Sequence, residues 1–167
     1  MSSIPSNDVQ VRRASLMHLK SIVDFNAAMA KETEGKELDN ELLRLGVEAV
    51  LASDDLGFYL VAEYAGRPVG QLFVTYEWSD WRNAFFWWIQ SVYVSSDFRR
   101  MGVYKALHAY AATEARSQGN VCGLRLYVEK DNRIAQGVYA GLGMLQTRYD
   151  MFEIEFKTGR EEENAVR

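Results

Sequence analysis

The sequence predicts a single α+β domain, in which a mixed, mainly antiparallel central sheet has helices on both faces. Three observations lead to this fold class. A chain of 167 residues has the length of one domain. Apolar residues make up 48% and charged residues 25% of it, as is typical of a globular protein. Strand and helix patterns follow one another in the order β-α-α-β-β-β-α-β-α-β, which favours a mixed sheet covered by helices.

The first half of the chain predicts an antiparallel sheet preceded by two helices. Helical spacing of apolar residues covers 16–30 and about 39–52. Residues 65–68, Ala-Gly-Arg-Pro, are typical of a turn between two antiparallel strands. The strands predicted here are 9–13, 58–64, 69–78 and 84–94. The last of them is apolar at nearly every position, which indicates a central strand buried on both faces.

The second half alternates helices with strands. Helices are predicted over 103–117 and from Asn132, which can cap its helix, to a stop at Gly143. A strand is predicted over 124–129, where apolar and polar residues alternate, and a last strand over roughly 147–156. The domain is expected to span 9–156, with a flexible N-terminus over 1–8 and a polar, disordered tail over 157–167.

Composition excludes several classes of function. Lys and Arg number 19 against 23 Asp and Glu, a net charge of −4, so we expect no nucleic-acid ligand. Two histidines and one cysteine, Cys122, predict no metal site. No segment has the roughly 20 apolar residues of a membrane span, so no membrane partner is expected. The polar first ten residues and the lone cysteine indicate the cytoplasm.

The stretch 92–105 is the most informative part of the chain. A buried strand runs into Arg99, Arg100 and Gly102, and a helix begins directly afterwards. The unpaired amides of the first helical turn, the helix dipole and two cationic side chains together favour an anion. A glycine lets that anion approach the main chain closely. The spacing therefore predicts a site of diphosphate size, and it lacks the Gly-Lys-Ser/Thr ending of a Walker loop.

Two motifs in this sequence resemble those of the GNAT superfamily of N-acetyltransferases. Residues 98–104, Phe-Arg-Arg-Met-Gly-Val-Tyr, resemble its acetyl-CoA signature, Gln/Arg-x-x-Gly-x-Gly/Ala. Asn132-x-x-Ala135-x-x-x-Tyr139, followed by Leu-Gly-Met at 142–144, resembles its second motif. The predicted order of elements matches the superfamily as well. The resemblance thus covers nearly the whole chain and implies a GNAT-type sheet.

The resemblance implies acetyl-CoA as the cofactor and assigns residues to it. Val92, Tyr93 and Val94 would hold the pantetheine arm through main-chain groups, and Asn132 would contact the same arm. The residues expected at the diphosphate are Arg99, Arg100, Met101, Gly102, Val103, Tyr104 and Lys105. Tyr104 stands where the family has a small residue, so either the loop adjusts or the tyrosine hydroxyl joins the binding. Tyr139 would lie near the sulfur as the general acid.

The chemistry also needs a group that takes a proton from the amine. A lysine-like amine has a pKa of about 10.4, so its deprotonation at pH 7 costs about 4 kcal/mol. Residues 75–81 and 88–94 resemble the polyamine and diamine acetyltransferases, which have a glutamate where this chain has Gln90. Gln90 can position a water but cannot accept a proton. Glu77 is the best candidate for a displaced base, and a water chain is the alternative.

The amine substrate is expected to be cationic. Glu32, Glu34 and Asp80 supply negative charge and Trp78 an aromatic face, which together suit an ammonium group. Glu32 and Glu34 can equally be a solvated helix end. We expect an N-acetyltransferase that acts on a small primary amine by direct attack on the thioester. The alternatives are acetylation of protein N-termini or lysines and a non-catalytic acyl-CoA sensor, and the aromatic content permits a homodimer.

Overall fold

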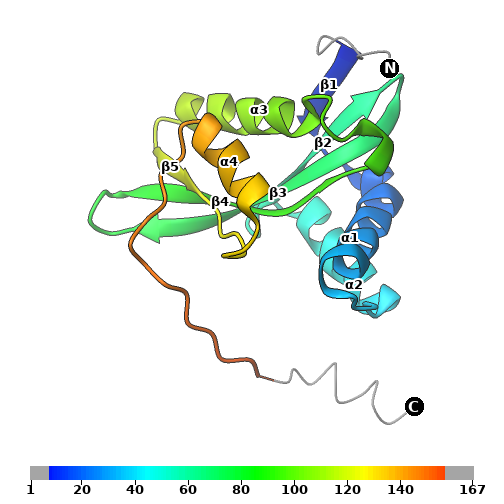
Figure 1. Cartoon of the computed structure of the whole chain (residues 1–167), viewed down its shortest axis with the longest axis horizontal. Coiled ribbons are helices and arrows are strands. Elements are labelled where there is room, and N and C mark those ends of the chain that lie inside the picture. The colour runs from blue at the N-terminus through cyan, green and yellow to red at the C-terminus, as the bar shows by residue number, and fades with distance from the viewer. Residues whose placement is uncertain (1–7, 157–167) are drawn as a thin grey trace. The chain divides into compact units, whose positions relative to one another are not determined.

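The computed structural model describes residues 8–156 of the chain (Figure 1). These residues divide into two compact units between Tyr127 and Val128, and each unit is described here by itself. The flexible segment expected over 1–8 lies outside the described residues except for its last position, and the tail expected over 157–167 lies entirely outside them. One domain over 9–156 stays a prediction.

The first unit is built on a five-stranded sheet in the order β1-β2-β3-β4-β5. Its strands are β1 (Val9–Arg13), β2 (Phe58–Tyr64), β3 (Arg67–Ser79), β4 (Ala84–Val94) and β5 (Val121–Arg125). Neighbours pair antiparallel except β4 and β5, which are parallel. The mixed, mainly antiparallel sheet predicted from the sequence is confirmed.

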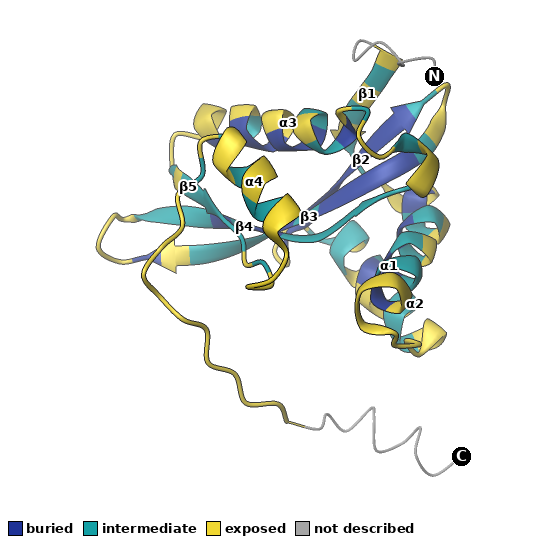
Figure 2. Cartoon of the chain, viewed as in Figure 1, coloured by how far each residue is buried: buried dark blue, intermediate teal, exposed yellow. Residues whose placement is uncertain are grey.

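Helices cover both faces of this sheet (Figure 1). Those of the first unit are the 3-10 turns η2 (Leu16–His18) and η3 (Ser96–Phe98) and the helices α1 (Leu19–Glu34), α2 (Asn40–Ala52) and α3 (Val103–Ser117). Ile22 of α1 and Val47 of α2 pack with Tyr59 and Val61 on one face. Val103 and Leu107 of α3 belong to a separate apolar cluster on the opposite face. Figure 2 shows the buried residues along the middle of the sheet and the inner side of α3.

Strand β4 contains a bulge that matters for the site. Its pairing with β3 shifts between Gln71 and Phe73, and Ser91 has a φ of +46°. The extra residue lets Val92 and Val94 pack against the same apolar cluster as Ile89, whereas simple alternation would put them on the opposite face. Buried Gln71 supports the bulge, because its Nε2 donates to the Ser91 carbonyl at 3.1 Å and to Asn26 Oδ1 at 2.6 Å.

Strands β4 and β5 separate partway along their length. Trp88 and Arg125 are the last residues of the two strands that pair, although β4 continues to Val94. Within residues 8–127, the edge of β4 beyond Trp88 that faces away from β3 therefore has no neighbouring strand. Unpaired backbone groups at such an edge are a template for another extended chain. The predicted strand at 124–129 was shifted along the sequence, since the observed strand ends at Arg125.

The second unit contains α4 (Arg133–Gly141). The predicted cap is confirmed, because the Asn132 side chain accepts a hydrogen bond from the Ala135 amide at 3.0 Å. The predicted strand over 147–156 is wrong: residues 145–156 are exposed and adopt no regular structure (Figure 2). A strand needs a hydrogen-bonded neighbour, and the described residues of this unit supply none.

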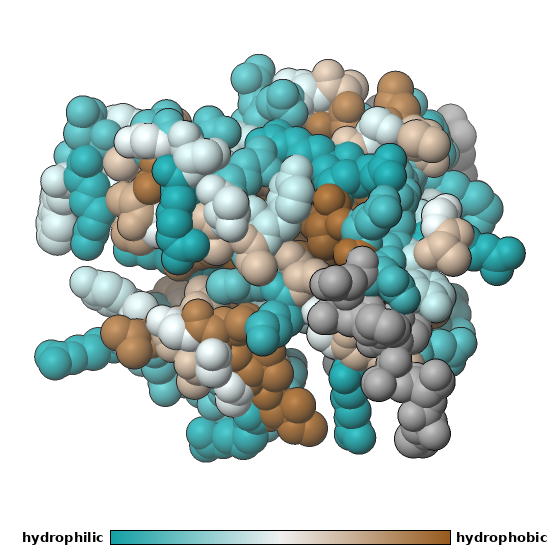
Figure 3. All heavy atoms as spheres, turned by 90° about the horizontal axis from the view of Figure 1, so that it is seen from above, coloured by the Kyte–Doolittle hydropathy of each residue, from teal (hydrophilic) through white to brown (hydrophobic). Residues whose placement is uncertain are grey.

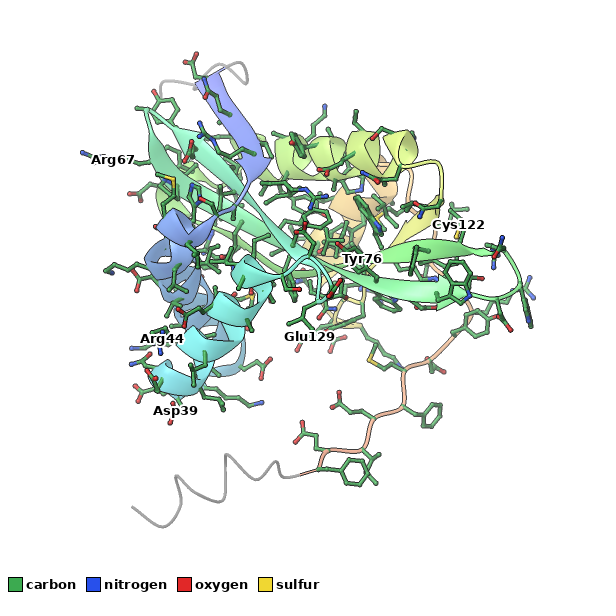
Figure 4. The ribbon with its side chains drawn as sticks, turned by 180° about the vertical axis from the view of Figure 1, so that it is seen from behind. Asp39, Arg44, Arg67, Tyr76, Cys122 and Glu129 are labelled. Atoms are coloured by element: carbon green, nitrogen blue, oxygen red, sulfur yellow. The ribbon has the colours of Figure 1, made fainter. Side chains whose placement is uncertain are left out.

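The described surface is hydrophilic over much of its area, with apolar patches among the polar atoms (Figure 3). Trp81 at the turn between β3 and β4 is 88% exposed. Cys122, on β5 in Figure 4, is also exposed, and its thiol donates to the Phe85 carbonyl at 3.3 Å. No helix among residues 8–156 has both the length and the apolar character needed to cross a bilayer.

Candidate functional site

The N-terminus of α3 has the backbone geometry of an anion site. Gly102 caps the helix with a φ of +81°, and Arg100 before it has a φ of +64°. No side chain caps this end, and a Cβ added to Gly102 would meet nothing within 4 Å. The first-turn amides of α3 are therefore open to a ligand. Arg100 and Lys105, two of the residues predicted at the diphosphate, are exposed on either side of Gly102.

Tyr104 packs into the fold instead of lying over this loop. Its ring belongs to the residues packed against the apolar cluster under α3, 6.0 Å from the ring of His108. Its hydroxyl oxygen is buried. Of the two alternatives for this bulky residue, adjustment of the loop is the one that this packing supports.

Arg99 is bound to protein groups. Its Nη2 lies 2.5 Å from Glu32 Oε2 of α1, and its Nε donates to the Val94 carbonyl at 2.9 Å. Tyr93 donates from its hydroxyl to Glu32 Oε1 at 2.8 Å. Hydrogen bonds from Arg99 and then Tyr93 hold the pKa of Glu32 below its ordinary value. Arg99 thus ties the end of β4 to the end of α1, and its contact with a diphosphate stays a prediction.

A second group of polar side chains lies on the sheet face opposite α3, where β4 and β5 separate. Glu77 Oε1 accepts from Arg125 Nη1 at 2.6 Å, and Glu77 Oε2 accepts from the indole of Trp88. The Arg125 guanidinium lies 3.6 Å from the centre of the Phe86 ring. Gln90 Nε2 donates to Thr75 Oγ1 at 2.5 Å. We call Thr75, Glu77, Phe86, Trp88, Gln90 and Arg125 the polar face.

The predicted base Glu77 is engaged at both carboxylate oxygens. The Arg125 guanidinium and the Trp88 indole each occupy an acceptor position on one of these oxygens. A basic role for Glu77 has not been tested and stays a prediction, as does the role of Gln90. Glu77 and Gln90 both belong to the polar face, on adjacent strands, with Trp88 between them along the sheet.

The other residues predicted to bind the amine are spread over the molecule. Trp78 packs edge-on against Phe85, whose ring belongs to the α3 side of the sheet, so it lies on the opposite face from Glu77. Asp80 follows the end of β3 and accepts from the Trp81 amide at 2.9 Å. The end of β4 nearest Asp80 is about 30 Å from Tyr93, the partner of Glu32, if each residue of the strand advances by its usual rise. Glu34, exposed at the end of α1, pairs with Lys36 at 2.6 Å.

Tyr139 and Asn132 lie on the second unit. The side-chain oxygen of Asn132 caps α4 by accepting from the Ala135 amide, which is the capping role expected from the sequence. Tyr139 is half-buried on the same helix, and burial raises the pKa of its hydroxyl above the ordinary value of 10.0. A protonated hydroxyl throughout the neutral range is what a general acid requires.

Sequence reasoning assigned no role to Arg125 or to the Trp88 indole. A signal was present for Arg125, because it lies between Leu124 and Leu126, which both pack into the apolar cluster. Its partner Glu77 is 48 residues away in sequence, so only the sheet register reveals the pair.

Comparison with known proteins agrees with this architecture. The model of the acetyltransferase (GNAT) family matches residues 21–144. A possible acetyltransferase from Clostridium difficile 630 is 43% identical, with a TM-score of 0.83 over 90% of this chain and 99% of that one. No curated protein sequence matches the chain.

Two further solved structures share the fold at lower identity. The ribosomal-protein-alanine N-acetyltransferase of Brucella melitensis is 18% identical, with a TM-score of 0.72 over 89% of this chain and 99% of that one. A predicted acetyltransferase from Clostridium acetobutylicum, solved with acetyl-CoA, is 18% identical with a TM-score of 0.71, over 88% of this chain and 96% of that one. With its family model matched over most of its length, the chain belongs to the GNAT acetyltransferase family.

Proposed function

We propose that this protein is an acetyl-CoA-dependent N-acetyltransferase whose substrate is the primary amine of a small molecule. One observation carries the proposal: the unpaired edge of β4 ends close in sequence to the uncapped N-terminus of α3. An extended amide chain that ends in a diphosphate would find main-chain partners along Val92–Val94 and anion-binding amides at 102–105. Addition of a strand-like ligand to a free sheet edge is a recurrent mode of recognition.

The residues fit this cofactor at both ends. Gly102 leaves open space where a diphosphate would approach, and Arg100 and Lys105 add positive charge beside it. The bulge at Ser91 sets the orientation of the main chain that follows. When bound, acetyl-CoA supplies an acetyl thioester, whose C–S bond breaks as the amine nitrogen forms a C–N bond to the acetyl carbon.

Two protons must move during the reaction. Tyr139 donates one to the departing sulfur, and burial of its hydroxyl keeps it protonated for that purpose. The proton lost by the amine passes to water, which Gln90 orients through its Oε1, because its amide nitrogen is held by Thr75. The alternative is that Glu77, which is bound to Arg125 and Trp88, takes this proton as a general base.

Release of free thiol from acetyl-CoA, measured across a panel of small amines and short peptides, tests this function. Turnover with one or more small amines is the expected result. Turnover with peptides alone would mean that the protein modifies other proteins. Tight acetyl-CoA binding without turnover on any amine would mean that it is a sensor, and it would contradict the proposal.

A further inference from the structure

Three of the carboxylates considered for the amine, Glu32, Glu34 and Glu77, are already paired, and this limits the substrates that the site suits. Glu32 is bound by Arg99 at 2.5 Å, Glu34 by Lys36 at 2.6 Å and Glu77 by Arg125 at 2.6 Å. Their negative charge is therefore compensated locally, and it does not form the excess of anions that would select a diamine or polyamine. The sequence analysis expected these carboxylates to attract a cationic amine, but their cationic partners could not be identified from the sequence.

On the polar face, Arg125 is a cation that can still bind a ligand beside its partner Glu77. Among the described residues, Nη1 is the one nitrogen of its guanidinium that donates to a protein acceptor. The side chain is 33% exposed, and its flat face rests on Phe86 at 3.6 Å. A guanidinium held in this way presents its other N–H groups in a plane, the geometry that suits a carboxylate.

Glu77 gives the same place a fixed negative group. The Trp88 indole holds one carboxylate oxygen and Arg125 the other, so the side chain is oriented before any ligand arrives. Each carboxylate oxygen can accept a further hydrogen bond. A positive and a negative group thus lie side by side with fixed orientations, which is complementary to a ligand that carries both charges.

The pair also lies where the chemistry is expected. Trp88 and Arg125 are the last paired residues before β4 and β5 separate, and Gln90 follows on the same face as Glu77. Helix α3 covers the opposite face, with Ile89 and Trp87 packed in its cluster. An amine that approaches the opening between the strands from the face opposite α3 would therefore meet the polar face.

We infer that the amine substrate also carries a carboxylate, as a free amino acid does, with Arg125 binding the carboxylate and Glu77 receiving the ammonium group. This inference rests on the proposed function and narrows its substrate class. Loss of one proton from the ammonium to water, oriented by Gln90, then leaves the neutral amine that attacks the thioester.

Matched pairs of substrates test the inference with the unaltered protein. Thiol release is measured for phenylalanine against phenethylamine and for lysine against cadaverine, where each pair differs by one carboxylate. A kcat/KM at least about tenfold higher for the amino acid is expected, since charge-assisted bonds to a carboxylate are among the strong ones. A higher kcat/KM for the amine would overturn the inference and leave the proposed function standing. No turnover of any amino acid, with turnover of other small amines in the panel, would likewise overturn the inference and leave the proposed function standing.

The variant Arg125→Gln locates the effect. We expect it to raise the KM of the amino acid about tenfold more than the KM of the matched amine, so the preference disappears. Arg82→Gln is the matched control, because Arg82 also lies over Phe86, at 5.1 Å, but forms no ion pair in the described structure. If Arg125→Gln fails to fold, Arg125→Lys keeps the charge and should still lose most of the preference. An unchanged preference in a folded Arg125 variant would exclude Arg125 as the carboxylate ligand.

Discussion

Tyr139 is the residue whose ionisation most directly concerns catalysis. Burial raises the pKa of its hydroxyl above 10.0, so the proton is retained across the neutral range and is lost only in strong alkali. As the pH rises through that raised pKa, the acid is lost and turnover should fall.

The substitution Tyr139→Phe removes this proton and leaves the ring. General acid catalysis contributes about 10²–10⁴-fold, so we expect kcat to drop by about 100-fold with little change in acetyl-CoA affinity. Steady-state kinetics and calorimetry measure the two quantities. An undiminished kcat would remove Tyr139 as the acid, and a parallel loss of affinity would make it a binding residue.

Single residues also show where sequence reasoning stops. Arg99 and Glu32 were each assigned to a ligand, and in the structure they bind one another although 67 residues separate them. A side chain with two possible partners cannot be assigned until the register of the elements is known. The backbone features at Gly102 were easier to predict, because they depend on neighbouring residues alone.

At the scale of the element, the bulge of β4 depends on a buried polar network. Gln71 is fully buried and donates to the Ser91 carbonyl and to Asn26, and Asn26 in turn donates to the Tyr59 hydroxyl at 3.2 Å. Removal of a donor from such a network leaves buried acceptors unpaired, at a cost of about 1–3 kcal/mol each.

We therefore expect Gln71→Met to lower stability and also to weaken acetyl-CoA binding, because it frees the bulge that orients Val92–Val94. Urea unfolding and calorimetry measure the two effects. Ile22→Val is the matched control. Ile22 of α1 is as fully buried as Gln71, and its substitution should lower stability by about 1 kcal/mol without removing a hydrogen bond to the bulge. Equal loss of affinity in both variants would mean that stability alone controls binding.

Most elements could be predicted because their patterns are local. Helix α3 and strands β2 and β4 begin and end as expected, since capping, turn chemistry and apolar periodicity all act within a few residues. The strand expected over 147–156 failed for the opposite reason, because a strand depends on a neighbour that the sequence does not name.

At the scale of the whole molecule, stability should depend on pH through His108. Burial and then the charge of Arg116 lower the pKa of this histidine below 6.5, and its Nε2 is buried without a hydrogen-bond partner among the described residues. The folded state therefore resists protonation. Stability is full above pH 6.5 and is lost as the pH falls through the depressed pKa.

The variant His108→Gln should flatten this dependence between pH 6.5 and 5, where carboxylates of ordinary pKa stay ionised. Urea unfolding at several pH values gives the free energy of unfolding for both proteins. A wild-type stability that stays constant over this interval, or a variant that declines just as steeply, would assign acid sensitivity to other groups.

The account as a whole depends on where acetyl-CoA binds. A crystal structure of the protein grown with acetyl-CoA should show pantetheine hydrogen-bonded to the main chain of Val92–Val94 and the diphosphate at the amides of 102–105. A ligand bound elsewhere, or an empty β4 edge at saturating acetyl-CoA, would contradict the account.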